Sequence, residues 1–186
     1  MADPTRPIFL LGMMGAGKTS VGRLLADKRG AEFVDLDERI ELMFAATIPA
    51  LFEHGEAYFR ACERAALRSL LAEPGFAGAS VIVATGGGIV SDPANLDDMA
   101  AHGTLVYLEL SPPRLAERLS TPQELARRPL LERGSILEGA EHPETTLSSR
   151  LATLLAAREQ AYRRAHVIVD GDDAPEQVFA NVDRAC

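Results

Sequence analysis

The chain has 186 residues, 47% of them hydrophobic, which is typical of one globular domain with its own core. Its net charge of −8 argues against nucleic acid as the main partner, because proteins that bind nucleic acid usually carry a basic surface. No apolar run is long enough to span a membrane, and residues 1–7 lack the apolar segment of a signal peptide. Two cysteines are too few for a disulfide framework or a Cys-based zinc site. We therefore expect a cytoplasmic protein.

The first predicted elements are a strand and a helix that flank a glycine-rich loop. The apolar run at 7–11 is typical of a buried strand, and residues 18–28 have a helical pattern, with Val21, Leu24 and Leu25 expected on one face and Gly30 at the end. Between them, the sequence GMMGAGKT fits the pattern G-x-x-x-x-G-K-[ST] of a phosphate-binding loop.

The residue types of this loop indicate a nucleotide site. Glycines allow successive backbone N–H groups to turn toward one anion, and the following helix N-terminus also favours negative charge. In such a loop, Lys18 reaches the β- and γ-phosphates and the hydroxyl of Thr19 binds Mg²⁺.

Two aspartates follow at the end of the next predicted strand, residues 32–36, and a helix is expected from Asp37 to Met43. Strand alternation would place Asp35 and Asp37 on the same side of an extended backbone. One carboxylate can help to hold hydrated Mg²⁺, and the other can orient and deprotonate an attacking hydroxyl. The alternative is a turn aspartate followed by a helix N-cap at Asp37.

A long amphipathic helix is predicted at 56–71, after a short helix that begins near Thr47 and an interruption at Gly55. Arg60 and Glu63 are three residues apart on this helix and share a face. They are either a surface ion pair or an arginine that binds a substrate carboxylate bidentately, with Glu63 holding its geometry.

The rest of the chain alternates between strands and helices. We expect strands at 80–84, 104–109 and 167–169 and helices at 94–101, 112–119, 147–164 and 174–184. This alternation predicts a parallel sheet covered on both faces, with ligands at the carboxyl ends of the strands. Gly86-Gly87-Gly88 lies at such an end, either as a tight turn or as backbone that approaches a small polar ligand.

Two later segments are also candidates for function. Residues 120–145 are rich in proline, glycine and charge, and a long irregular stretch of this kind is often a lid. Arg158 and Tyr162 have helical i,i+4 spacing, which allows surface positions for both, although Tyr162 is expected in the core.

Six motifs occur in one order along the chain: GMMGAGKT at 12–19, DLD at 35–37, FRACE at 59–63, GGG at 86–88, RPLL at 128–131 and R-x-x-x-Y at 158–162. The ordered set resembles the shikimate kinase family over essentially the whole chain. The resemblance implies a three-layer α/β/α P-loop kinase fold of the nucleoside monophosphate kinase type, with five parallel strands in the order 2-3-1-4-5. It also implies one kinase domain over 1–186, with a shikimate-binding helical segment at about 37–72 and a mobile lid at about 120–145.

The activity implied by the resemblance is transfer of the ATP γ-phosphoryl group to the 3-hydroxyl of shikimate, in the biosynthesis of aromatic amino acids. Mg²⁺ would be bound by Thr19 and, through water, by Asp35. The implied catalytic residues are Lys18, Asp37 and Arg128, with Asp37 as the candidate base. The implied ATP-binding residues are Gly15, Ala16, Gly17, Lys18, Thr19, Ser20, Arg118 against adenine, and the lid residue Arg128.

The acceptor site implied by the resemblance combines charge, backbone and an apolar wall. Arg60 and Arg158 would hold the shikimate carboxylate, and Asp37 would bind its hydroxyls. The other implied contacts are the apolar wall of Phe52 and Phe59 and the backbone of Gly86, Gly87 and Gly88.

Other functions stay open on the sequence. A gluconate kinase has the same fold and a carboxylate substrate, although the FRACE, GGG and RPLL motifs favour shikimate. A regulatory GTPase would carry an N/T-K-x-D guanine motif, and neither Lys18 nor Lys28 lies in one. A third alternative is a binding module with an inactive phosphate-binding loop. The intact Lys18, Thr19 and Asp37 argue against it. We expect ATP and shikimate as partners, no nucleic acid or membrane, and a monomer.

Overall fold

The computed structural model describes residues 6–121 and 146–186. These residues form one sheet of five parallel strands, in the order β2-β3-β1-β4-β5. The strands are β1 (Ile8–Leu11), β2 (Glu32–Asp35), β3 (Val81–Ala84), β4 (Thr104–Glu109) and β5 (Val167–Asp170). The predicted strand order is therefore confirmed.

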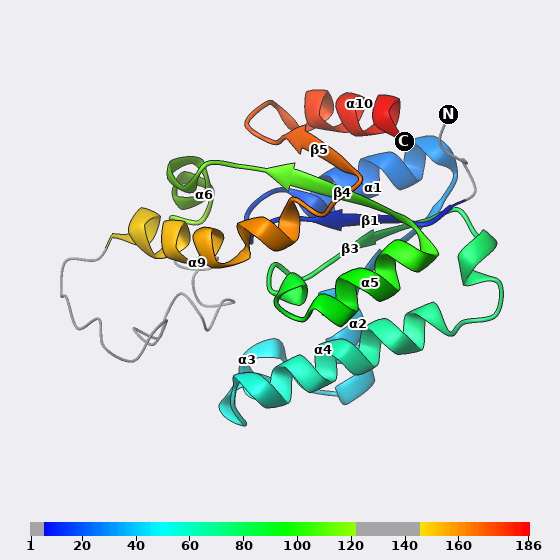
Figure 1. The fold of residues 1–186 in the computed structure, drawn as a ribbon, viewed down its shortest axis with the longest axis horizontal. Coiled ribbons are helices and arrows are strands. Elements are labelled where there is room, and N and C mark those ends of the chain that lie inside the picture. Colours follow the sequence, from blue (N-terminus) through cyan, green and yellow to red (C-terminus); the bar gives the residue numbers. More distant parts are fainter. Residues whose placement is uncertain (1–5, 122–145) are drawn as a thin grey trace.

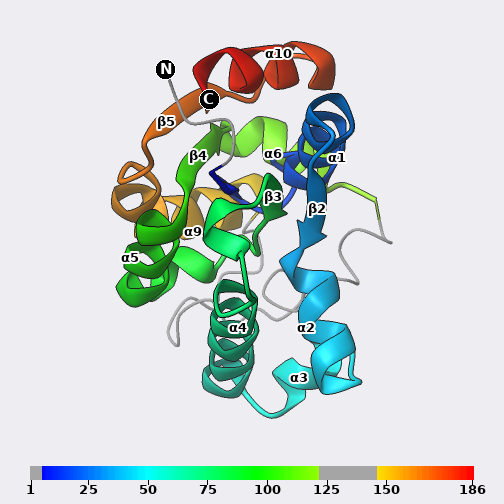
Figure 2. The same cartoon turned by 90° about the vertical axis from the view of Figure 1, so that its right-hand side faces the viewer.

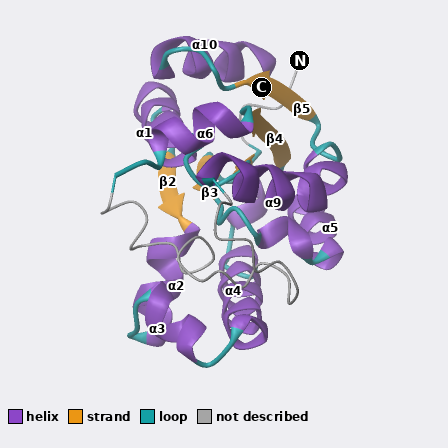
Figure 3. Cartoon of the chain, turned by 90° about the vertical axis from the view of Figure 1, so that its left-hand side faces the viewer, coloured by secondary structure: helices purple, strands orange, loops and turns teal. Residues whose placement is uncertain are grey.

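Helices cover both faces of this sheet (Figure 1). On one face, α1 (Lys18–Arg29) packs beside α10 (Pro175–Ala185). The other face is covered by α5 (Pro93–His102) and α9 (Leu147–Tyr162), and α6 (Pro112–Arg118) packs against α9. Figure 3 shows the two helical layers separated by the strands, which confirms the predicted three-layer fold.

A further group of helices lies beyond the carboxyl end of β2 (Figure 2). It consists of α2 (Leu36–Phe44), α3 (Ile48–Glu53) and α4 (Glu56–Leu71), which pack on one another. Two short 3₁₀ turns, η1 (Phe76–Gly78) and η2 (Ile89–Ser91), precede and follow β3. Among the described helices, each is too short or too polar to cross a membrane.

The central strands form the core because helices pack on both of their faces. Every residue of β1 and β3 is buried, as are the four inner residues of β4. The outer strands are more open, and Ile168 on β5 is 42% exposed. On α1, Val21 and Leu25 are buried as predicted, but Leu24 is 39% exposed and does not belong to the buried face.

The start of α2 differs from the prediction. Asp35, not Asp37, is the N-cap, and its Oδ1 accepts hydrogen bonds from the N–H groups of Asp37 at 3.0 Å and Glu38 at 3.5 Å. The chain turns helical at Leu36, because this capping satisfies N–H groups that the helix itself cannot pair. Asp35 and Asp37 therefore do not share one side of an extended strand, and Asp37 lies in the first turn of α2.

Candidate active site

A cavity of about 620 Å³ opens at the carboxyl ends of the central strands. It is lined by every described residue that the sequence analysis assigned to a site: Gly15, Ala16, Gly17, Lys18, Thr19, Ser20, Asp35, Asp37, Phe52, Phe59, Arg60, Gly86, Gly87, Gly88, Arg118 and Arg158. Arg128 and residues 122–145 of the predicted lid lie outside the described residues.

The phosphate-binding loop forms one wall of the cavity. Gly15 and Gly17 have φ angles of 79° and 92°, a left-handed region in which a Cβ would be strained. The Lys18 ammonium donates to the carbonyl oxygens of Gly12 at 2.8 Å and Met13 at 2.9 Å. The loop thus holds a nearly buried cation beside a helix N-terminus, an arrangement suited to phosphate.

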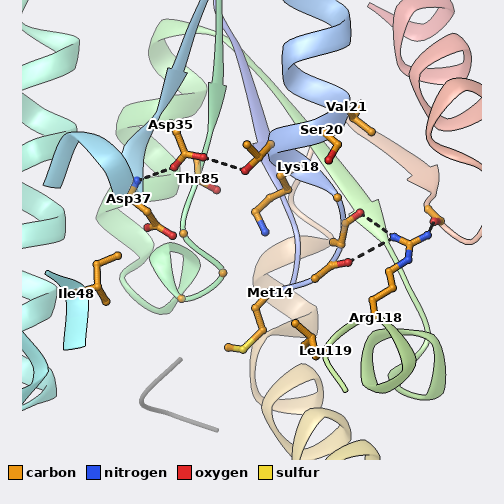
Figure 4. Close-up of a pocket in the computed structure, with 18 of the residues that line it drawn as sticks. Met14, Lys18, Ser20, Val21, Asp35, Asp37, Ile48, Thr85, Arg118 and Leu119 are labelled. Atoms are coloured by element: carbon orange, nitrogen blue, oxygen red, sulfur yellow. Dashed lines mark hydrogen bonds between the residues drawn. The ribbon is translucent and has the colours of Figure 1, made fainter. Parts of the chain in front are cut away.

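A hydrogen bond joins this loop to the carboxylate that caps α2. Oγ1 of Thr19 donates to Oδ2 of Asp35 at 2.9 Å, and both residues line the cavity, in which Figure 4 labels Asp35. A hydroxyl and a carboxylate are oxygen ligands of the type that Mg²⁺ prefers. Among the described residues, no group of three or more His, Cys, Asp or Glu side chains could hold a metal. One hydroxyl and one carboxylate fit Mg²⁺, which usually keeps several waters and binds substrate phosphates.

The carboxylate of Asp37 faces the glycine turn, which we define as Gly86, Gly87 and Gly88 (Figure 4). A Cβ placed on Gly86 would lie 2.9 Å from Oδ1 of Asp37 and 2.9 Å from Oε1 of Glu63. Two carboxylates therefore approach the backbone at the same point. Only glycine leaves room for both of them.

Arg60 is held by two glutamates of its own helix. Its Nη1 donates to Oε2 of Glu63 at 2.8 Å, while its Nη2 donates to Oε1 of Glu56 at 2.9 Å. Glu63 is only 1% exposed, so the interpretation of this pair as a surface ion pair is wrong. A Cβ on Gly88 would lie 2.3 Å from Nη2 of Arg60, so the guanidinium occupies the space beside the glycine turn.

Glu63 is a buried acid of the cavity whose pKa is raised. Burial raises the pKa of its carboxyl, and the charge of Arg60 opposes the rise only in part. Its Oε1 has no hydrogen-bond partner among the described residues, although Glu63 lines the cavity. Oε1 is itself buried and lies against Gly86, so an acceptor without a partner among the described residues lies beside the glycine turn.

Helix α9 supplies a second arginine from the opposite side. Nη1 of Arg158 donates to the carbonyl of Gly87 at 3.3 Å. Tyr162, one turn further, is fully buried as predicted, but its hydroxyl also donates to the Gly87 carbonyl. The sequence analysis missed this contact, although the i,i+4 spacing had placed both side chains on one face.

The apolar wall comes from α3 and α4. The rings of Phe52 and Phe59 stack with centroids 4.3 Å apart and an interplanar angle of 22°. Both residues are almost fully buried and line the cavity together with Ile48. This stack provides a flat apolar surface beside Arg60.

Arg118 connects the phosphate-binding loop to the loop after β5. Its Nη1 donates to the carbonyls of Gly15 and Ala16, both at 3.4 Å, and its Nη2 donates to the carbonyl of Gly171 at 3.0 Å. The loop after β5 and the start of α10 also contribute cavity residues that the sequence analysis did not assign: Gly171 and Asp173 from the loop and Pro175 from α10. Their position after the last strand is the signal that could have found them.

Comparisons with known proteins agree on one family. Residues 14–186 match the family model for shikimate kinase. A shikimate kinase from Halorhodospira halophila is 43% identical over 169 residues, which cover 90% of this chain and 84% of that protein. The structure of a shikimate kinase from Acinetobacter baumannii in complex with shikimate has a TM-score of 0.81 at 32% identity, covering 95% of this chain and 90% of that one.

A gluconokinase from Sinorhizobium meliloti is also similar in structure, with a TM-score of 0.58 and 20% identity. The alignment covers 99% of this chain and 93% of the gluconokinase. At this identity the likeness extends to the fold alone.

Proposed function

This chain belongs to the shikimate kinase family, and we propose how its residues transfer the γ-phosphoryl group of ATP to the 3-hydroxyl of shikimate, giving shikimate 3-phosphate and ADP. The observation that supports this most is the meeting of three features in one cavity: the phosphate-binding loop, the carboxylates around Gly86 and two arginines from different helices. The reaction serves the biosynthesis of chorismate and aromatic amino acids.

The phosphate-binding loop is the ATP side of the proposal. The backbone N–H groups of residues 15–20 would bind the phosphate oxygens at the start of α1. Lys18 would exchange the carbonyls of Gly12 and Met13 for phosphate oxygens and balance charge that develops during transfer. Arg118 would pack on adenine, beside the loop after β5 that its Nη2 contacts at Gly171.

Thr19 and Asp35 would hold Mg²⁺, the threonine directly and the aspartate through water. The ion supplies positive charge that neutralises the phosphates and makes the γ-phosphoryl group more electrophilic. The 2.9 Å hydrogen bond between the two side chains supports this pairing, because it keeps both oxygens at the edge of the phosphate-binding loop.

Asp37 is the proposed general base. The hydrogen bond from Thr19 places Asp35 beside the phosphate-binding loop, which favours the metal side for Asp35, and the position of Asp37 against Gly86 favours the acceptor side for Asp37. Asp37 faces the glycine turn, where backbone groups could orient the ring hydroxyls. The proton of the attacking 3-hydroxyl would pass to the Asp37 carboxylate as the oxygen bonds to phosphorus.

Arg60 and Arg158 are the proposed clamp for the shikimate carboxylate. Their planar forks suit a carboxylate, and Glu63 and Glu56 hold the fork of Arg60 in place. The stacked rings of Phe52 and Phe59 would cover one face of the shikimate ring.

Three further assignments rest on the family resemblance. Arg128, outside the described residues, would contact the transferred phosphate from a lid at about 120–145. Residues 1–186 would form one kinase domain, with the shikimate-binding segment at about 37–72. The enzyme would act as a monomer in the cytoplasm.

An acceptor panel tests the proposal. ADP release is coupled to NADH oxidation, and the purified protein is given Mg-ATP with shikimate, gluconate, a nucleoside monophosphate or no acceptor. We expect release with shikimate only, loss of activity with EDTA, and shikimate 3-phosphate in the product by ³¹P NMR. A folded protein that releases ADP with gluconate but not with shikimate would overturn the assignment.

A further inference from the structure

Tyr162 combines complete burial with a polar contact to the cavity wall. Its side chain is 0% exposed, and its ring stacks on that of Tyr107 of β4, with centroids 4.7 Å apart and an interplanar angle of 5°. Its hydroxyl donates to the carbonyl of Gly87 at 2.5 Å. The ring of Tyr162 is thus packed in the core, while its hydroxyl makes a hydrogen bond to the glycine turn.

Among the residues that the structure describes, the Gly87 carbonyl has two donors, and both come from α9. The Tyr162 hydroxyl is closer, at 2.5 Å, while Nη1 of Arg158 lies at 3.3 Å. A carbonyl in this position needs at least one partner, because an unpaired polar group away from water is costly. While Tyr162 satisfies the carbonyl, Arg158 can turn toward another anion without leaving Gly87 unpaired.

The Tyr162 contact also sets the orientation of the glycine turn. The peptide between Gly87 and Gly88 is planar and trans, so fixing the carbonyl of Gly87 fixes the opposite direction for the N–H of Gly88. Gly88 in turn lies directly against the guanidinium of Arg60. The peptide group that Tyr162 holds is therefore in contact with both proposed carboxylate-binding arginines: Arg158 donates to its carbonyl, and Arg60 lies against Gly88.

The hydroxyl remains a donor throughout the working range of an enzyme. Burial raises the pKa of Tyr162 well above its ordinary value, and the charge of Arg158 opposes this rise only in part. The raised pKa therefore favours the protonated hydroxyl that donates to Gly87 at neutral pH.

We propose that Tyr162 is a positioning residue for acceptor binding: its hydroxyl satisfies the Gly87 carbonyl, fixes the glycine turn and leaves Arg158 available to the substrate carboxylate. This inference rests on the proposed function, in which Arg158 binds that carboxylate. It assigns to a core tyrosine an effect on the affinity for shikimate and no contact with shikimate itself.

Tyr162→Phe tests the inference, with Tyr107→Phe as the matched control. Both changes keep the stacked rings, but only the first removes the donor to Gly87. We expect Tyr162→Phe to raise the KM and the calorimetric Kd for shikimate roughly 3- to 10-fold, the loss typical of one hydrogen bond. The KM for ATP should stay unchanged, and Tyr107→Phe should change neither affinity.

A double-mutant cycle tests whether Tyr162 acts through Arg158. In an Arg158→Lys background the fork is already lost, so the further loss from Tyr162→Phe should shrink or vanish. Full additivity of the two losses would overturn the inference. So would a Tyr162→Phe protein with a lower Tm and unchanged shikimate affinity, because the hydroxyl would then serve stability alone.

A label gives a second measurement if Tyr162→Phe does not fold. In protein made with 3-fluorotyrosine, the ¹⁹F signal of Tyr162 should shift on saturation with shikimate, because Arg158 then leaves the shared carbonyl. An unchanged signal would overturn the inference. Failure of the proposed function looks different, since the unmodified enzyme would then release no ADP with shikimate.

Discussion

Oδ2 of Asp35 accepts a 2.9 Å hydrogen bond from Thr19, while Oδ1 of the same carboxylate caps α2. One side chain therefore joins the phosphate-binding loop to the helical group that forms the proposed acceptor side. Changes at Asp35 should reach both the metal and the position of α2, and the two effects can be separated by the choice of substitution.

Asp35→Asn should raise the Mg²⁺ concentration that half-saturates activity, by roughly 10-fold or more. The amide oxygen can still cap α2, but the negative charge and the Oδ2 acceptor for Thr19 are lost. Asp35→Ala loses the cap as well, so urea unfolding should show a further loss of about 1 kcal/mol. An Asp35→Asn enzyme with the Mg²⁺ dependence of the wild type would remove Asp35 from the metal site.

Asp37→Asn should lower kcat by about 10²- to 10⁴-fold, the range typical for loss of a general base. The helix should be unaffected, because Asp35 and not Asp37 is its cap. Glu38→Gln is the control, since Glu38 is the next residue and pairs on the surface with Arg23. Turnover of Asp37→Asn close to that of the control would contradict the catalytic role.

Gly88→Ala should weaken shikimate binding by about 10-fold or more, the loss of one charge-assisted hydrogen bond. The new Cβ would lie 2.3 Å from Nη2 of Arg60 and would displace the guanidinium from its position between Glu56 and Glu63. The KM for ATP should change little. Gly78→Ala is the matched control, because, among the described residues other than its chain neighbours, none has an atom within 4 Å of a Cβ at Gly78. Equal shikimate affinity in both variants would place Arg60 outside the acceptor site.

Asp183→Asn should lower stability at neutral pH but not in acid. Asp183 accepts from Lys28 at 3.0 Å and Arg29 at 2.9 Å, which joins α10 to α1. Hydrogen bonding from Lys28, then from Arg29, holds the pKa of its carboxyl below the ordinary value. A lowered pKa contributes stability above the unfolded pKa of about 3.9, and this contribution disappears as the pH falls through the folded pKa.

The Tm difference between Asp183→Asn and the wild type should therefore be constant from about pH 5 upward. Below about pH 4 the two Tm values should become equal. Asp27→Asn, on the exposed side of α1, is the control for loss of one negative charge. A Tm difference that does not change with pH would mean that the ion pairs are not its source.

Much of the site could be predicted because its residues lie in local patterns. Residue types at short spacing predict the phosphate-binding loop, Arg60 on α4 and the glycine turn. The order of the six motifs along the chain then indicated the family and the strand order. The sequence analysis erred where two local preferences compete. Asp35 can end a strand or cap a helix, and the pairing of the first N–H groups of α2 with Oδ1 decides for the cap.

The sequence by itself determined the family, the alternation of strands and helices and more than half of the described residues that line the cavity. Only the tertiary structure decided how they meet. Glu63 is buried because α4 packs beside the glycine turn, and the hydroxyl of Tyr162 reaches Gly87 although 75 residues separate them in the chain. Such contacts depend on the packing of distant elements around one sheet, and no local pattern of residue types contains the distance between two elements that are far apart in sequence.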